Sequence, residues 1–395
     1  MGALDGLMVV DLSRVLAGPF CGQLFAENGA DVIKVETPEG DLNRAFPLVL
    51  GDGESTNFQS VNRGKRDITL NLKSPAARAI LDRLIAKADV VIQSFLPNVA
   101  AKLGVDWERV QTLNPDLIYV SISGYGAKGE LANKPGYDTM VAAYSGVMSL
   151  TGEPDRPPVR PGVTAIDLST GMLAYSGAMT ALMARERGKA RGQRVNVSLL
   201  ESGVTLLGFH AVSWLAAGHL DQREGAGYST LAPYDAYRAK DGDVLIGAPT
   251  EAMWAKTCIA LDAPELREDV RFATNPERCA NRAALREEIE RRLAAAPVAV
   301  WIGRLEAAGV ATAPINTIDT ILADPQVLAN DMVVECPAAD GSSQRLLGLP
   351  FKLTGTPGAP GAAPPKIGQH NREVLREMLG LEDAEIDALA KEGAI

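Results

Sequence analysis

Short apolar runs rich in Val and Ile alternate with helix-forming stretches through the first 125 residues of the chain. Parallel strands must be joined by long crossovers, and helices on both faces of a sheet leave its strands uniformly apolar. The alternation therefore predicts a doubly wound α/β unit with a parallel sheet. Its predicted strands are Leu7–Leu12, Asp31–Glu36, Asp89–Gln93 and Leu117–Ser123.

The middle of the chain has a different pattern. Thr164–Ala184 and Val195–Gly218 are apolar enough to predict two long helices, and Tyr234–Ala248 predicts a hairpin that turns at Asp241-Gly242. A second, smaller α+β domain is therefore expected from about residue 225 to residue 325. Further elements are expected at Arg282–Ala295, Val300–Ala308, Val333–Glu335 and Arg345–Leu349, before the Pro/Gly-rich segment Thr354–Gly368.

Charge and composition exclude several classes of partner. A net charge of −10 argues against general nucleic-acid binding, which needs a basic surface, although a local basic pocket can still bind an anion. The four Cys residues form no CxxC pair, so we expect no disulfide framework and a reducing, cytoplasmic location. No basic segment precedes the first apolar run, and the apolar stretches are shorter than the ~20 residues of a membrane span, so we expect no signal peptide and no membrane partner.

Several common catalytic motifs are absent from the sequence. No GxGxxG follows the first predicted strand and no GxxxxGK[ST] occurs, which disfavours a dinucleotide-dependent dehydrogenase or a P-loop enzyme. With three His and no HExxH, we expect no metal site. The absence of G-x-S-x-G argues against an α/β-hydrolase.

Asp167 lies between an apolar run and a predicted helix that is rich in small residues. An Asp at such a junction is most simply a helix N-cap. The same position also suits a nucleophile, because free N–H groups and the helix dipole would hold a carboxylate ionised and oriented. An ionised carboxylate can attack an activated acyl group and form a covalent intermediate.

Other features also have two interpretations each. Asp138 is either a cap of the helix that follows it or a site residue, and Tyr137 is either a core residue or a hydroxyl at the mouth of a pocket. Gly225 and Gly227 mark either an interdomain hinge or a loop that closes over a site.

The basic cluster Arg63–Arg66, with Lys73 and the nearby Arg44, is either a solvated turn or a docking site for phosphates.

Taken together, these segments resemble the class III coenzyme A transferases, the formyl-CoA transferase and carnitine CoA-transferase group, which shares its fold with α-methylacyl-CoA racemase. The match runs in order through nearly the whole chain. The segments that carry it are Leu4–Leu7, Arg14–Pro19, Gly29–Glu36, Gly40-Asp41, Asn62–Arg66, Ser123–Gly126, Pro135–Asp138, Asp167–Gly171 and Gly368–His370.

The resemblance implies a chemistry for Asp167. This residue occupies the position of the family's nucleophilic aspartate, which accepts an acyl group from a thioester and then carries CoA as an aspartyl thioester. CoA and acyl-CoA are then substrates, and no tightly bound cofactor is expected. Backbone donors would stabilise each oxyanion, and a closing loop would shield the anhydride from water.

The resemblance also carries CoA contacts onto this sequence. Thr37 stands where some members have Arg, and Lys102 replaces a common Arg. Lys73 and Lys102 would meet phosphates, and Phe95 would lie against the adenine or the pantetheine. The full set of implied contacts is Leu16, Ala17, Thr37, Leu70, Asn71, Leu72, Lys73, Ser94, Phe95, Leu96, Lys102, Tyr137 and Asp138.

The fold implied by the resemblance is a Rossmann-like, parallel-sheet large domain built from both termini, with a smaller α+β middle domain, in an interlocked homodimer. We assign residues 1–200 and 326–395 to the large domain, residues 201–224 to a linker helix and residues 225–325 to the small domain.

Two other functions remain open. The racemase branch has a His where Tyr137 stands, and Tyr is a poor base near neutral pH, so a racemase is the alternative rather than the first choice. A non-catalytic acyl-CoA-binding protein is a further alternative.

The sequence around Arg160 resembles that of family members that use dicarboxylates, and succinyl-CoA is the expected donor. Arg160 either pairs with the distal carboxylate of such a substrate or is a surface residue.

Overall fold

The computed structural model describes residues 2–50 and 53–395, which form two compact units. The first unit comprises Met1–Val147, Pro161–Val212 and Pro325–Ile395, and the second comprises Met148–Arg160 and Ser213–Asp324. The chain thus returns to its first unit at the end. Residues 148–160, which the sequence analysis placed in the large domain, belong to the second unit.

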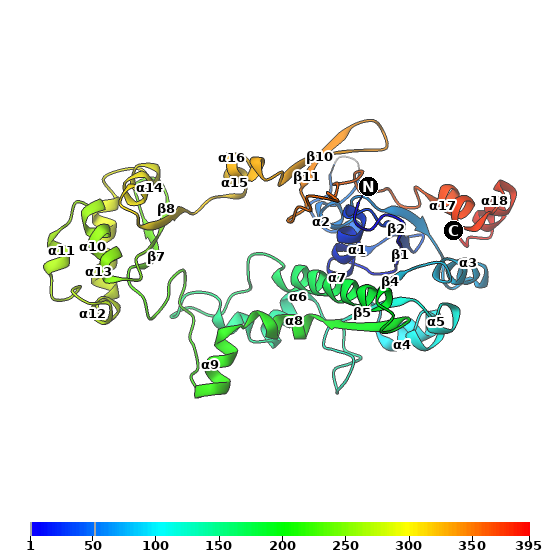
Figure 1. The fold of residues 1–395 in the computed structure, drawn as a ribbon, viewed down its shortest axis with the longest axis horizontal. Helices are drawn as coiled ribbons and strands as arrows, with labels where there is room; N and C mark the ends of the chain where they lie inside the picture. The colour runs from blue at the N-terminus through cyan, green and yellow to red at the C-terminus, as the bar shows by residue number, and fades with distance from the viewer. Residues whose placement is uncertain (1, 51–52) are drawn as a thin grey trace. The chain divides into compact units, whose positions relative to one another are not determined.

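A six-stranded parallel sheet forms the centre of the first unit (Figure 1). The strand order is β3-β2-β1-β4-β5-β6, so the direction of winding reverses between β1 and β4. Ligands of open parallel sheets bind at such a reversal, outside the carboxyl ends of the strands. The strands are β1 (Met8–Asp11), β2 (Asp31–Glu36), β3 (Arg66–Thr69), β4 (Val90–Gln93), β5 (Ile118–Ser123) and β6 (Gln193–Ser198).

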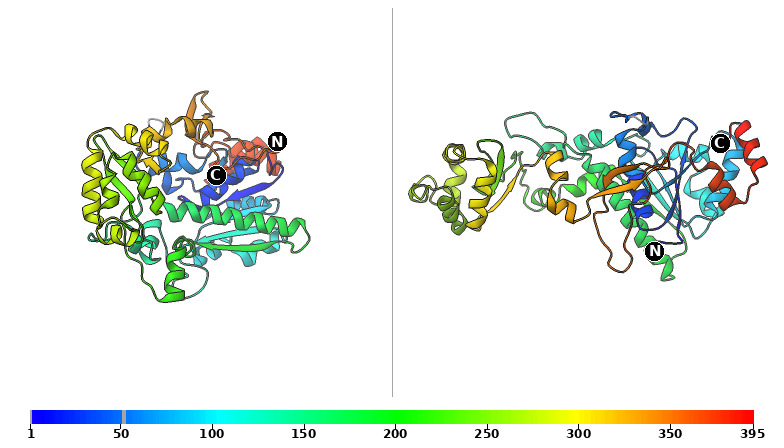
Figure 2. Two further views of the ribbon diagram at one scale, coloured as in Figure 1. Left: turned by 60° about the vertical axis from the view of Figure 1, so that its left-hand side comes forward. Right: turned by 90° about the horizontal axis from the view of Figure 1, so that it is seen from above.

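Helices cover both faces of this sheet. On one face α1 (Ala17–Glu27) packs along α7 (Ala165–Glu186) (Figure 1). A Cβ at Gly171 would lie 2.6 Å from the carbonyl oxygen of Ala17, so glycine is required for this close approach. On the other face a continuous core joins the sheet to α3 (Pro75–Ile85), α5 (Trp107–Leu113), α17 (Asn371–Leu379) and α18 (Asp383–Lys391), the last two in red in Figure 2.

The second unit has its own core. Three antiparallel strands, β7 (Tyr234–Arg238), β8 (Asp243–Gly247) and β9 (Ala311–Pro314), pack with helices around Trp254, Phe272 and Trp301. The predicted hairpin at 234–248 is confirmed. The helices of this unit are α10 (Glu251–Ala260), α11 (Glu265–Glu268), α12 (Asn275–Ala280), α13 (Arg282–Leu293), α14 (Val298–Ala307) and α15 (Ile318–Leu322).

Shorter elements connect these parts. The remaining helices of the first unit are α2 (Thr56–Val61), α4 (Pro97–Leu103), α6 (Asp138–Tyr144), α8 (Leu199–Leu206) and α16 (Pro325–Ala329), with a 3-10 turn at Leu42–Ala45. α9 (Phe209–Ala217) spans the boundary between the units, and a second 3-10 turn lies at Val147–Leu150. The strands β10 (Val333–Pro337) and β11 (Ser343–Leu347) form an antiparallel pair.

The prediction of one long helix over Val195–Gly218 is wrong. Residues 195–198 end β6, and two helices, α8 and α9, follow with a bend of 76° between them. Ser198 ends β6 and caps α8 by accepting from the N–H of Glu201, so the polar residues that end the strand also start the helix. By length and composition, no single helix in the described part of the chain could cross a membrane, and only the bent α8–α9 pair passes that test together.

Candidate active site

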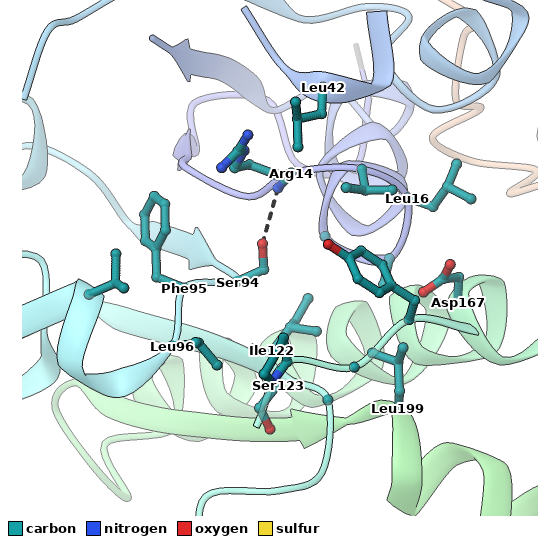
Figure 3. Close-up of a pocket in the computed structure, with 18 of the residues that line it drawn as sticks. Arg14, Leu16, Leu42, Ser94, Phe95, Leu96, Ile122, Ser123, Asp167 and Leu199 are labelled. Atoms are coloured by element: carbon teal, nitrogen blue, oxygen red, sulfur yellow. Dashed lines mark hydrogen bonds between the residues drawn. The ribbon is translucent and has the colours of Figure 1, made fainter. Parts of the chain in front are cut away.

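A cavity of about 330 Å³ lies at the carboxyl ends of β1, β4 and β5, where the winding of the sheet reverses (Figure 3). The turns after β1 and β4 form much of its wall, and Asp167 and Leu199 line it from the helical layer. Seven of the predicted site residues meet here: Leu16, Ala17, Ser94, Phe95, Leu96, Tyr137 and Asp167.

The carboxyl group of Asp167 is the acidic group of this lining. Asp167 is the third residue of α7 and is half-buried. Burial, together with the negative charge of Asp138, raises the pKa of Asp167 to about 7. The expectation that the helix terminus holds the Asp167 carboxylate ionised is therefore wrong below about pH 7, because desolvation and a like charge oppose ionisation.

Asp138 supplies the cap that the sequence analysis assigned to Asp167. One oxygen of Asp138 accepts from the N–H of Ile166 at 3.0 Å and from the N–H of Asp167 at 3.1 Å. Asp138 is itself the first residue of α6, whose N-cap residue, Tyr137, makes no side-chain cap. Asp138 therefore caps α7 rather than the helix that follows it, which brings two carboxylates together at one helix terminus.

A second cavity, of about 220 Å³, lies beside the first and shares Arg14 and Phe95 with it. Its wall comes from the turn after β2 and from the segment after β3. The predicted contacts Thr37, Leu70, Asn71, Leu72 and Lys73 all line it. The two cavities thus contain most of the residues that the resemblance assigned to CoA.

Other predicted site residues lie outside both linings. Lys102 is exposed on α4, and Arg160, Gly225 and Gly227 belong to the second unit. Within that unit, a Cβ at Gly225 would lie 2.7 Å from a carboxylate oxygen of Glu153, so close packing already requires a glycine at this position.

The basic cluster around Arg63 and Lys65 is neither a solvated turn nor a phosphate site. Lys65 is buried and pairs with Asp11 at 2.9 Å, and the buried Arg63 pairs with Glu27. Arg44 pairs with Glu36 at 2.9 Å and also contacts Glu54 and Asp67. Arg66 pairs with Asp31, Glu373 and Glu377. These cations neutralise carboxylates that the fold brings to them, and Lys73 is the member of the set that lines the second cavity.

Two residues of the site were missed by the sequence analysis as contacts. Arg14 lines both cavities, and Val15 lines the first with a φ of +70°. A β-branched residue rarely adopts this conformation. The carboxylate of Asp41 holds the N–H of Val15 at 3.1 Å, and the amide of Asn43 donates to the Val15 carbonyl at 2.7 Å. The signal for both residues was their place directly after the first strand, where a parallel sheet faces its ligand.

No group of three or more His, Cys, Asp or Glu side chains in residues 2–50 and 53–395 is placed to hold a metal ion.

Comparisons with known proteins agree on one family. The model of CoA-transferase family III matches residues 4–371. A succinyl-CoA:glutarate CoA-transferase of Mus musculus is 35% identical over 100% of this chain and 91% of its own length. A succinyl-CoA:mesaconate CoA-transferase of Haloarcula marismortui is 38% identical over 95% of this chain and 96% of its own. The crystal structure of a CAIB/BAIF family protein from Brucella suis superposes with a TM-score of 0.89 at 36% identity, covering 95% of this chain and 99% of that one.

Proposed function

The chain belongs to CoA-transferase family III, and from this membership we propose that it transfers CoA from succinyl-CoA to a small dicarboxylic acid through a thioester on Asp167. The observation that carries the proposal is the place of the Asp167 carboxyl group. It is the acidic side chain of a cavity at the switch point of the sheet, and a second cavity with exposed cationic side chains adjoins it.

The substrates follow from the relatives. The proteins of Mus musculus and Haloarcula marismortui are both named for succinyl-CoA as the donor, and their acceptors, glutarate and mesaconate, are both dicarboxylates. A donor shared by two such distant relatives supports succinyl-CoA here. The acceptor is a dicarboxylate of similar size.

The proposed reaction has four steps and needs no net proton. An oxygen of Asp167 attacks the succinyl carbonyl, the C–S bond breaks, and an aspartyl–succinyl anhydride and CoA thiolate result. The thiolate attacks the aspartyl carbonyl, the anhydride C–O bond breaks, and succinate leaves. The acceptor carboxylate then attacks the aspartyl thioester, which forms a new anhydride and frees the thiolate. The thiolate finally attacks the acceptor carbonyl, and Asp167 leaves as a carboxylate.

The electrostatics of the site favour the covalent intermediate. Ionised Asp167 lies in a half-buried position beside the charge of Asp138, which opposes ionisation. Acylation converts the Asp167 carboxylate into a neutral anhydride or thioester, so this repulsion is relieved as the bond forms. The repulsion between the two carboxylates is unfavourable before the attack and weakens as Asp167 loses its charge, so it lowers the barrier to the first step. Asp138 therefore has two functions, as the cap of α7 and as the charge that destabilises the free nucleophile.

We also propose that the protein is a homodimer. α9 exposes Phe209, Val212, Trp214 and Leu215, the last with 83% of its surface accessible. An exposed apolar stripe of this kind is typical of a surface that a partner covers. Light scattering should give twice the chain mass for the wild type and a lower mass for Leu215→Glu; a monomeric wild type would contradict the proposal.

Intact-mass spectrometry tests the catalytic proposal. The wild type mixed with succinyl-CoA should gain a CoA-sized adduct, and hydroxylamine should convert Asp167 into its hydroxamate, located by peptide mapping. Asp167→Asn should gain no adduct, whereas Asp155→Asn, which changes an exposed Asp of the second unit, should behave as the wild type. An adduct that persists in Asp167→Asn would refute the role of Asp167. Exchange of the α-proton with solvent in the absence of any adduct would favour a racemase.

A further inference from the structure

The two cavities meet at Arg14, whose side chain lines both of them. Phe95 is the other residue that they share. Figure 3 shows Arg14 on the turn that also carries Leu16, facing the turn that carries Ser94 and Phe95. A ligand long enough to occupy both cavities would therefore contact Arg14.

Few cationic groups at these cavities are available to a ligand. Lys34 lines the second cavity but is buried, with its ammonium group bound to Asp41 at 3.2 Å and to the Ser13 carbonyl at 3.1 Å. Arg14 and Lys73 also line it, and both are exposed. Within the described residues, neither of their side chains forms an ion pair or hydrogen bond.

The carboxylates of the second cavity are largely neutralised. Asp41 pairs with Lys34, and Glu36 pairs with Arg44. Glu39 is the exception: it is exposed, and a hydrogen bond within its own residue, one from the Thr37 hydroxyl and the charge of Lys73 lower its pKa, so this carboxylate stays ionised. Within the described residues, no carboxylate is paired with Arg14 at the junction of the cavities, whereas Lys73 shares the second cavity with the charge of Glu39.

The backbone around Arg14 is held on both sides. Its own N–H donates to the hydroxyl of Ser94 at 3.1 Å, shown dashed in Figure 3. The next residue, Val15, is fixed in its left-handed conformation by Asp41 and Asn43. The backbone that carries the Arg14 side chain is therefore held in place. Only the side chain has to be ordered when Arg14 binds a ligand, so less conformational freedom is lost.

The order of charges along CoA matches the order of groups along the cavities. From its thiol end CoA carries a neutral pantetheine arm, then a diphosphate, then an adenosine with a 3′-phosphate. With the thioester carbon at Asp167, the arm lies in the first cavity. The diphosphate is then the first anionic group to be met, at Arg14, and the 3′-phosphate follows toward Lys73.

We propose that Arg14, at the junction of the two cavities, binds the diphosphate of acyl-CoA and so selects diphosphate-bearing thioesters over shorter ones. Lys73, which the resemblance already assigns to a phosphate, is then left for the 3′-phosphate. This inference rests on the proposed function, because it takes acyl-CoA as the ligand. Arginine suits the task because its planar fork of N–H groups matches phosphate oxygens two at a time.

A ladder of truncated substrates tests the assignment. The succinyl thioesters of CoA, 3′-dephospho-CoA and pantetheine are compared with the wild type, Arg14→Gln and Lys73→Gln. Arg14→Gln should raise KM for the first two roughly 10- to 100-fold, the range of one or two charge-assisted hydrogen bonds, with kcat changed less than about 3-fold. It should match the wild type with succinyl-pantetheine. Lys73→Gln should weaken succinyl-CoA alone. Arg187→Gln, an exposed arginine at the end of α7, controls for the lost charge.

Several outcomes would overturn the proposal. An equal effect of Arg14→Gln on all three thioesters would place its action elsewhere than on the diphosphate, and an unchanged KM for succinyl-CoA would remove the role altogether. Calorimetric binding of CoA and pantetheine separates this from the proposed function, since it requires no turnover. If the wild type binds CoA with the Arg14 dependence but forms no aspartyl adduct, the transfer function fails while the diphosphate site stands.

Discussion

The raised pKa of Asp167 predicts that the ionised side chain lowers the stability of the folded protein at neutral and alkaline pH. The pKa lies at about 7 in the folded state against an ordinary value of 3.8, because burial and Asp138 disfavour the charge. The folded state therefore binds the proton more tightly than the unfolded chain does. The contribution to stability is fully present below pH 4 and is lost as pH rises through 7. At pH 8 the loss is at most about 4 kcal/mol, since water in the cavity screens part of it.

Asp167→Asn removes this loss without changing the size of the side chain. At pH 8 the variant should melt above the wild type by ~5–10 °C, given about 2–4 °C for each kcal/mol in domains of 150–250 residues and less in longer chains. The difference should shrink as the pH falls and vanish only below about pH 3, where Asp167 is protonated in the folded and the unfolded states alike.

Differential scanning calorimetry at pH 4.5, 6, 7 and 8 measures the effect. Asp155→Asn, an exposed Asp of the second unit, serves as the matched control and should follow the wild type at every pH. A difference that does not change with pH would show that the Asn acts by packing rather than by charge. A variant that melts below the wild type at pH 8 would show that the Asp167 charge does not destabilise the folded protein.

Three further predictions follow from single contacts. Asp138→Asn keeps an oxygen to cap α7 but removes the charge that raises the pKa of Asp167. The acid limb of the pH profile of kcat/KM, which ionisation of Asp167 sets near pH 7 in the wild type, should therefore move to lower pH in steady-state assays. An acid limb at the wild-type pH would contradict the Asp138 charge as a cause of the raised pKa. Gly171→Ala places a Cβ against α1 and should lower stability by about 1–3 kcal/mol in urea titrations, whereas a neutral result would mean that the helices move apart freely. Lys65→Met leaves Asp11 buried without its cation and should destabilise by about 3–5 kcal/mol, with soluble expression and Tm as readouts; a wild-type Tm would show that the pair contributes nothing.

The sequence predicted those strands that are covered on both faces. β1, β2, β4 and β5 are runs of Val and Ile because helices cover both sides of the sheet, and these runs are visible without knowledge of any contact. β3 and β6 were missed because they are the edges of the sheet and begin with polar pairs, Arg66-Asp67 and Gln193-Arg194. Their strand conformation depends on hydrogen bonds to neighbours that local sequence does not reveal.

The same limit applies to charges in the site. Asp167 could be singled out because its position before a helix of small residues is a local feature. The raised pKa of Asp167 could not be predicted, because one of its causes is the charge of Asp138, which lies 29 residues away in the sequence. The basic cluster failed for a similar reason: the carboxylates that neutralise Arg63 and Lys65, on Glu27 and Asp11, come from distant parts of the chain. A count of charges along the sequence records the cations and says nothing of their partners.

The passage of oxygen through Asp167 distinguishes transfer through an aspartyl thioester from direct attack of the acceptor on succinyl-CoA. In the proposed steps an oxygen of the acceptor carboxylate enters the second anhydride and remains on Asp167 when that anhydride is resolved by the thiolate. Turnover with an acceptor labelled with oxygen-18 should therefore place the label in the Asp167 side chain, found by peptide mass spectrometry, and then in the succinate released in later turnovers. Labelled succinate with an unlabelled Asp167 would mean that the acceptor attacks succinyl-CoA directly, and would contradict the account.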